Sequence, residues 1–203
     1  MPLSDALRGM DREEKLEHIL DAVVACLARY GFSGTTMDII AEEAGVSKGT
    51  LTYYFKNKED IIARVAAHVA NKFHGEVRES LQGLTDPRER LMRVIDQFWA
   101  GYVGRPELIS GYYDLWSQSF FYPALREEVL RIYTDFRKLF LDELSRLPQS
   151  AYSDQESLLN DAILIAAVFD GVAMQFRTEP ELADWGKVLT RLKRIVATMI
   201  DSA

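Results

Sequence analysis

The chain has 203 residues, 48% of them hydrophobic, and a net charge of −7 at neutral pH. That is enough apolar surface for one compact unit, or for a small domain joined to a larger one. The single cysteine, Cys26, excludes an internal disulfide. The N-terminal residues lack the apolar run of a signal peptide, and the longest apolar run, 162–169, is far too short to cross a membrane. We therefore expect a cytoplasmic protein without a membrane partner.

Apolar residues recur at helical spacing from end to end, and no strand-like alternation of any length is present. The pattern predicts an all-α fold of about nine helices. The first helix is expected over residues 11–30, ending at Gly31. Cys26 lies on its apolar side, which is typical of an inert core residue.

Residues 35–60 carry the pattern of a helix-turn-helix. The Thr35 hydroxyl is predicted to cap the first helix, and Gly45 can adopt the positive φ that reverses the chain. Ser47 is predicted to cap the second helix. Asn57 is placed to cap a third helix beginning at Lys58.

The second helix of this motif presents short or flat side chains outward, a composition suited to base edges in a DNA major groove. The predicted outward residues are Gly49, Thr50, Thr52 and Tyr53. Residues 47–58 contain three lysines and no acid, which gives an acidic protein a local cationic edge. The competing interpretation is a capped helical hairpin inside an all-α core. Three caps, a tight turn and this outward run together favour DNA binding.

The same block resembles the signature of the TetR (tetracycline-repressor) family of bacterial transcription regulators. The matching residues are Thr36, Ile40, Ala41, Ala44, Gly45, Val46, Ser47, Gly49, Thr50, Leu51, Tyr54, Phe55, Lys58 and Glu59. The chain departs from the family at Thr52, where members usually carry Tyr. Residues 98–103, the Trp116 region and residues 164–176 also loosely resemble the subgroup around the choline-responsive repressor of glycine-betaine synthesis.

The resemblance implies a helix-turn-helix DNA-binding domain over residues 1–57. It implies a ligand-binding and dimerisation domain over residues 58–203. A homodimer would bind a palindromic operator in double-stranded DNA and would be released by a small amphipathic effector. The predicted base contacts are Lys48, Gly49, Thr52 and Tyr53; the predicted phosphate contacts are Thr36, Tyr54 and Lys58; and Thr35 and Thr50 complete the predicted surface.

Aromatic residues concentrate between residues 98 and 140, where two explanations compete. They fill the core of a helical domain, or they line an amphipathic effector pocket. The predicted lining is Phe98, Trp99, Tyr102, Tyr113, Trp116, Phe120 and Phe169. Asp114 and Asp170 are the acids placed to meet a cation, although Asp170 is more simply read as bonding a neighbouring helix. A cationic or aromatic effector and a fatty one are equally compatible with this composition.

Two unusually apolar helices are expected over residues 155–177 and 181–201. From the residues alone, they form either an interior pair or an interface with a second copy. The family resemblance favours the interface, because family members dimerise through their two C-terminal helices. The predicted seam is Leu159, Ala162, Ala166, Val172, Ala173, Leu192, Ile195 and Met199.

No catalytic set, cofactor motif or metal site is visible in the sequence. His18, His68 and His74 do not pair on one helical face, and Cys26 does not join them. The second reading of the chain is a helical ligand-binding or protein-interaction module that does not use DNA. An enzyme is the third.

Overall fold

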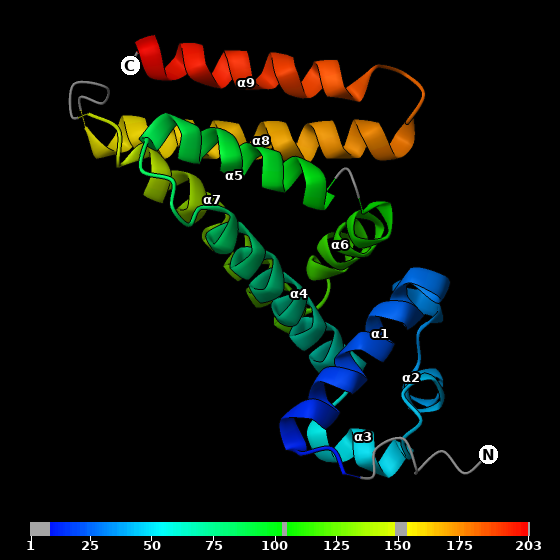
Figure 1. Ribbon diagram of the computed structural model, residues 1–203. Coiled ribbons are helices and arrows are strands. Elements are labelled where there is room, and N and C mark those ends of the chain that lie inside the picture. Colours follow the sequence, from blue (N-terminus) through cyan, green and yellow to red (C-terminus); the bar gives the residue numbers. More distant parts are fainter. Residues whose placement is uncertain (1–8, 103–104, 149–153, 203) are drawn as a thin grey trace. The chain divides into compact units, whose positions relative to one another are not determined.

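The computed structural model describes residues 9–102, 105–148 and 154–202. These residues form nine helices and no strand, so the all-α prediction is confirmed (Figure 1). The helices are α1 (Arg12–Gly34), α2 (Met37–Glu43), α3 (Lys48–Tyr54), α4 (Lys58–Ser80), α5 (Pro87–Tyr102), α6 (Pro106–Ser119), α7 (Pro123–Leu144), α8 (Gln155–Thr178) and α9 (Trp185–Ser202).

The chain divides into two compact units, each made of two segments. Unit 1 consists of Met1–Lys72 and Ser110–Arg131, and unit 2 consists of Phe73–Ile109 and Ile132–Ala203. This division does not follow the predicted domain boundary between residues 57 and 58. The reason is that α4 and α7 are continuous helices that each contribute to both units.

In unit 1, α1 begins at a capping box, in which Asp11 accepts the Glu14 amide and Glu14 accepts the Asp11 amide. The helix breaks at Gly31, whose φ of 64° and ψ of −179° are non-helical. A last turn then continues to Gly34, beyond the predicted end. Cys26 is fully buried, as expected of a core residue, and this burial raises the pKa of its thiol.

The turns and caps of the helix-turn-helix follow the sequence pattern with one exception. Gly45 has a φ of 64° between α2 and α3, and the Ser47 hydroxyl accepts the Thr50 amide at 3.0 Å. Asn57 accepts the Asp60 amide at 2.8 Å and so caps α4. The exception is α2, which is capped by Thr36 and not by Thr35.

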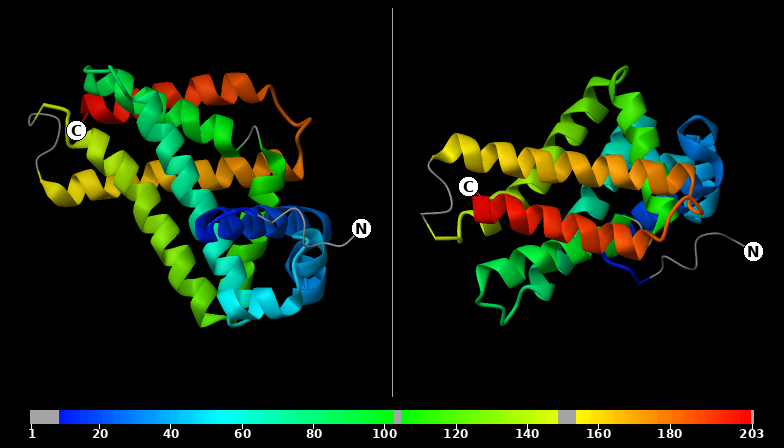
Figure 2. Two further views of the ribbon diagram at one scale, coloured as in Figure 1. Left: turned by 60° about the horizontal axis from the view of Figure 1, so that its bottom comes forward. Right: turned by 90° about the horizontal axis from the view of Figure 1, so that it is seen from above.

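In unit 2, α5 packs against α8 and α9, and α8 packs against α9. Figure 2 shows α8 and α9 running alongside each other in both views. Their shared core contains a tight group of phenylalanine rings. Phe98 of α5 lies 4.1 Å from Phe136 and 5.8 Å from Phe169, measured between ring centroids. Phe140 packs 5.4 Å from Phe98.

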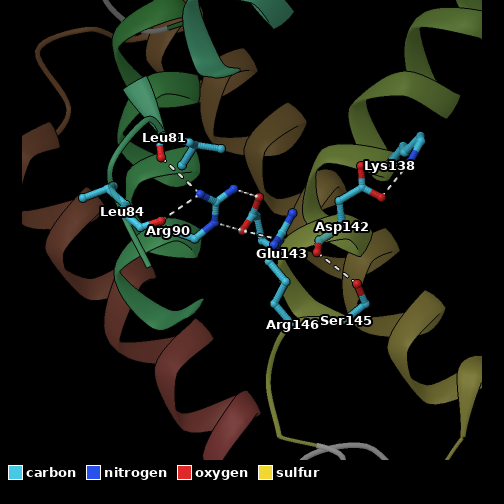
Figure 3. Close-up of polar contacts among 8 residues, drawn as sticks. All are labelled: Leu81, Leu84, Arg90, Lys138, Asp142, Glu143, Ser145 and Arg146. Carbon is cyan, nitrogen blue, oxygen red and sulfur yellow. Dashed lines mark hydrogen bonds and ion pairs between the residues drawn. The ribbon is translucent and has the colours of Figure 1, made fainter. Parts of the chain in front are cut away.

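A buried ion pair ties α5 to α7 at the edge of this core (Figure 3). Arg90 binds Glu143 in a two-pronged arrangement, with N···O distances of 2.6 and 2.8 Å. The same guanidinium donates to the carbonyls of Leu81, which begins the turn after α4, and of Leu84, which follows that turn. Because the charge and four of the five N–H donors of Arg90 are partnered, the pair can be largely buried.

Among the described helices, α8 alone is long and apolar enough to span a bilayer, judged by length and composition. One such helix is weak evidence for a membrane span, because a core helix of a soluble protein has the same character. In this chain α8 buries one face in unit 2, through Ala162, Ile165, Ala166, Phe169 and Ala173.

Candidate nucleic-acid interface and effector-binding residues

The outward face of α3 has the composition predicted for a DNA-reading helix. Gly49, Thr52 and Tyr53 are all exposed, with Tyr53 76% accessible. Their spacing of three and four residues places them on one side of the helix. Thr52 donates its hydroxyl to the Gly49 carbonyl, and Thr50 is half-buried with its hydroxyl 2.9 Å from that of Ser47. Gly49, Thr52 and Tyr53 therefore form a small, open surface.

Thr35 does not belong to that surface. Its side chain is fully buried, and its hydroxyl donates to the Gly31 carbonyl at 2.7 Å. The neighbouring Thr36 is exposed, and its hydroxyl accepts the Ile39 amide at 3.3 Å. Sequence reasoning chose between two adjacent threonines of the same chemistry. Tertiary burial at the break in α1 decides between them.

Lys48 and Lys58, the two lysines predicted to contact DNA, are both engaged within the protein. The Lys48 ammonium lies 2.8 Å from one Asp38 oxygen and 3.0 Å from the other. The Lys58 ammonium donates to the Phe32 carbonyl at 3.0 Å and lies 4.2 Å above the Phe32 ring. Half-buried Lys58, a predicted phosphate contact, therefore braces the end of α1 in this structure.

Phe32 is also held from its other side. Asp114 of α6 accepts the Phe32 amide at 2.5 Å. This amide is available because the break at Gly31 removes its helical partner. Tyr122, before α7, packs its ring 5.6 Å from the Phe32 ring. Sequence analysis placed Asp114 near a ligand cation, but in the structure its carboxylate joins the end of α1 to α6.

Tyr54, the other predicted phosphate contact, is half-buried, and its ring packs edge-on to Tyr53 at 5.2 Å. Of the predicted DNA surface, only Thr35 is buried; exposed or partly exposed are Thr36, Lys48, Gly49, Thr50, Thr52, Tyr53, Tyr54 and Lys58.

The predicted effector residues are divided between the two compact units. Phe98 and Phe169 are buried in the phenylalanine core of unit 2, and half-buried Trp99 packs against the same core. In unit 1, Trp116 meets the exposed ring of Phe120 edge-on at 4.9 Å. Tyr113, also in unit 1, is half-buried beside Tyr112. The Tyr102 side chain lies outside the described part of the structure.

Asp170 is the ionisable group of unit 2 with the most unusual environment. It follows Phe169 in the middle of α8 and is half-buried. Desolvation raises the pKa of its carboxyl to about 6, and a hydrogen bond from Tyr133 of α7 opposes this rise. The bond to a neighbouring helix is the role that the sequence favoured. Asp170 accepts a hydrogen bond from Tyr133, and its carboxyl group is drawn out of water beside the apolar core.

The predicted dimer seam falls on two different faces. Ala162, Ala166, Ala173 and Leu192 are buried within unit 2, so they belong to the interior of the subunit. Leu159 and Ile195 are exposed, and Val172 and Met199 are half-buried. The exposed apolar stripe of α8 also contains residues that were not predicted, namely Ile163, Leu164, Val168 and Met174.

The described residues form an all-α fold that contains a helix-turn-helix. The exposed side of α3 is suited to contact DNA, so the fold and this surface are those of a DNA-binding regulator. Residues 19–65 match the family described as bacterial regulatory proteins, tetR family. Residues 87–201 match the family described as BetI-type transcriptional repressor, C-terminal. The chain belongs to the TetR family and carries a C-terminal domain of the BetI type. It is a ligand-responsive, DNA-binding transcriptional regulator.

Curated relatives are transcriptional regulators. The regulator BetI of Paraburkholderia phymatum is 27% identical over 141 residues, which cover 66% of this chain and 71% of the relative. The nicotine-responsive repressor HdnoR of Paenarthrobacter nicotinovorans is 24% identical over 170 residues, covering 82% of this chain and 86% of that protein.

Solved structures share the fold along nearly the whole chain. A transcriptional regulator from Pseudomonas aeruginosa PAO1 has a TM-score of 0.83 at 20% identity, and the match covers 98% of this chain and 95% of that one. A transcriptional regulator from Saccharomonospora viridis, in complex with choline, has a TM-score of 0.74 at 21% identity. That match covers 94% of this chain and 97% of the other.

Proposed function

We propose that the protein is a cytoplasmic repressor that binds a palindromic operator as a homodimer and is released by a small organic cation. The observation that carries the DNA-binding part is the open face of α3, where Gly49, Thr52 and Tyr53 stand exposed on a helix capped by Ser47. In helix-turn-helix proteins, the second helix of the motif enters the major groove with such residues toward the bases.

Within this proposal, Tyr53 and Thr52 read base edges and Lys48 lies beside them. Thr36 and Tyr54 are placed to donate hydroxyl groups to phosphates, because such contacts fix the register of a protein on the duplex. Thr35 and Lys58 are left out of the surface, because both are engaged inside unit 1.

The homodimer is supported by the exposed apolar stripe of α8 and its neighbour Ile195 on α9. Leu164 is 55% exposed and Ile195 is 50% exposed. Apolar exposure of this kind marks an interaction surface, and isologous pairing buries the same stripe on both subunits. Two copies would carry two α3 helices, which suits a site with two-fold symmetry.

A cationic effector is supported by Asp170 and the rings near it. The carboxylate of Asp170 is drawn out of water, and such a group favours an added positive charge beside it. Aromatic rings attract the same charge through their faces. The choline complex of the Saccharomonospora viridis regulator and the nicotine response of HdnoR are consistent with an organic amine. A neutral or fatty effector remains the alternative.

The DNA part is tested by selecting operators from a library of random duplexes and then measuring Tyr53→Ala. The variant should lose about 1–3 kcal/mol of binding free energy at one operator position, with unchanged thermal stability. If no sequence is enriched by the wild-type protein, the chain is instead a helical module that does not use DNA.

The effector part is tested by calorimetry with choline and with its neutral analogue, in which carbon replaces the quaternary nitrogen. Choline should bind more tightly than the analogue, and Asp170→Asn should weaken choline at least about tenfold, or about 1.4 kcal/mol. Equal binding of both molecules, or an unchanged affinity in Asp170→Asn, would contradict a cation site at Asp170. Tight binding of a long-chain acyl compound would support the fatty alternative.

A further inference from the structure

The cationic side chain at the start of α3 is already paired before DNA arrives. Lys48 contacts both oxygens of Asp38, which stands in the first turn of α2. Both side chains remain open to solvent, with 57% of Lys48 and 73% of Asp38 accessible. The carboxylate therefore lies on the same exposed surface as the lysine.

Other cations near the helix-turn-helix are engaged in the same manner. Arg29 of α1 pairs with Glu43 of α2 at 3.1 Å, and Arg64 pairs with Asp60 within α4 at 3.4 Å. Lys58 is bound to the Phe32 carbonyl. Lys48, Lys58, Arg29 and Arg64 are thus engaged within the protein, whereas Lys56, directly after α3, stands exposed.

This pairing has a defined effect on binding to DNA of any sequence. Non-specific affinity comes from lysines and arginines that replace condensed counterions at phosphates. A lysine that is held by a carboxylate releases fewer counterions, because the phosphate must first displace or share the carboxylate. The carboxylate itself also repels the phosphate. Base contacts by α3 offset this loss only at the correct sequence.

We propose that Asp38 is a specificity-determining residue, which masks Lys48 and so weakens binding to non-operator DNA. This inference rests on the DNA-reading surface proposed above. Sequence reasoning missed Asp38 in this role. The residue lies ten positions before its partner, and only the fold brings them together.

Replacing Asp38 by Asn should release Lys48. Affinity for a random duplex should rise on the order of tenfold at low salt, and the dependence of log K on log salt should steepen by about 0.9 for each additional phosphate neutralised. Operator affinity should change by less than about threefold, because Thr52 and Tyr53 supply the base contacts there and Lys48 can keep its pair with Asp38. The ratio of operator to random-duplex affinity should therefore fall.

The experiment measures fluorescence anisotropy on a labelled random duplex and on a selected operator, between about 50 and 200 mM salt. The proteins are the wild type, Asp38→Asn, Lys48→Ala and the double variant. Asp38→Ser serves as a second test, because serine is also well tolerated near a helix N-terminus. The matched control is Glu42→Gln, an exposed carboxylate on the same helix that removes the same charge.

Masking predicts that the effect of Asp38→Asn on random DNA disappears in the Lys48→Ala background, and that Glu42→Gln does not reproduce it. An effect of equal size in both backgrounds, an equal effect of Glu42→Gln, or no change in Asp38→Asn and Asp38→Ser would overturn the inference. Failure of the proposed function has a different signature. In that case the wild type prefers no selected sequence, while the comparison on random duplexes still decides whether Asp38 masks Lys48.

Discussion

The degree to which a single ionisable residue is removed from water depends on the fold and cannot be read from the sequence. Asp170 has a raised pKa because its carboxyl is drawn out of water, and Tyr133 only partly compensates. A charge that is drawn out of water costs stability unless it is paired or neutralised. Asp170 is thus a residue at which fold stability and the proposed effector binding oppose each other.

The pH dependence of folding should report this cost. The pKa of Asp170 is about 6 in the folded chain against an ordinary value of 3.8, so the folded state binds the proton more tightly. Stability from Asp170 is therefore greatest below about pH 4 and falls as the pH rises through about 6, by roughly 3 kcal/mol at most. Asp170→Asn should remove this component in urea unfolding and be more stable than the wild type at neutral pH. An unchanged pH profile in Asp170→Asn, with Glu42→Gln as the control, would show that Asp170 is not desolvated.

The Arg90–Glu143 pair predicts a large contrast between two neighbouring carboxylates. Glu143→Ala leaves the Arg90 charge buried without its partner and should cost about 3–5 kcal/mol of unfolding free energy. Asp142→Ala breaks only the exposed pair with Lys138 and should cost less than about 1 kcal/mol. Urea denaturation of the two variants measures the difference. Similar losses would mean that Arg90 keeps enough solvent contact to stand alone.

At the scale of elements, the break in α1 determines how the end of that helix is joined to α4 and α6. Gly31 has a backbone conformation that residues with a side chain rarely adopt. The break exposes the Phe32 amide to Asp114 and turns the Phe32 carbonyl to Lys58. One glycine thus links α1 to both α4 and α6 within unit 1.

Gly31→Ala should therefore destabilise the protein by about 1–3 kcal/mol, because the new side chain opposes the required φ. The strain comes from the backbone, since an added Cβ would meet the Asp114 carboxylate only at an ordinary 3.5 Å. The control is Gly75→Ala in the middle of α4, where an added Cβ meets nothing within 4 Å. It should be neutral or stabilising by up to about 1 kcal/mol, as in ordinary helix interiors. A loss in Gly75→Ala as large as that in Gly31→Ala would point to packing instead of conformation.

Local chemistry explains which features of the elements could be predicted. Ser47, Asn57 and Gly45 act through atoms within a few residues of themselves, so the sequence identified their roles correctly. The choice between Thr35 and Thr36 depends on what packs over the break at Gly31. The engagement of Lys58 and Asp114 with Phe32 joins residues that are far apart in the chain, and no local pattern predicts it.

At the scale of the whole molecule, the two faces of α8 have separate tasks. One face fills the core of unit 2, and the other leaves Leu164 and Val168 exposed. The sequence identified α8 and α9 but not the division of their faces. A helix that is apolar around most of its circumference has no polar face to show which side is interior. Four of the eight residues predicted to form the dimer seam are therefore buried in the core of unit 2.

This division predicts opposite outcomes for two glutamate substitutions on α8. Val168→Glu places a charge on the exposed stripe and should give folded monomers that bind operator DNA weakly. Ala166→Glu places it in the core, where an unpaired charge is strongly destabilising, and should give unfolded or aggregated protein. Sedimentation with circular dichroism distinguishes the two. A wild-type monomer at micromolar concentration, or a dimeric Val168→Glu, would argue against pairing through this stripe.

The ion pairs around α3 also bear on how the protein finds its site on a chromosome. A regulator held firmly by random DNA travels mainly by sliding, whereas one held weakly leaves the duplex often and searches through solution. With Arg29, Lys48 and Arg64 paired to carboxylates and a net charge of −7, we expect this chain to belong to the second kind. Few of its copies would be sequestered on the bacterial chromosome. A small number of molecules per cell would then keep an operator occupied and still dissociate promptly when effector arrives.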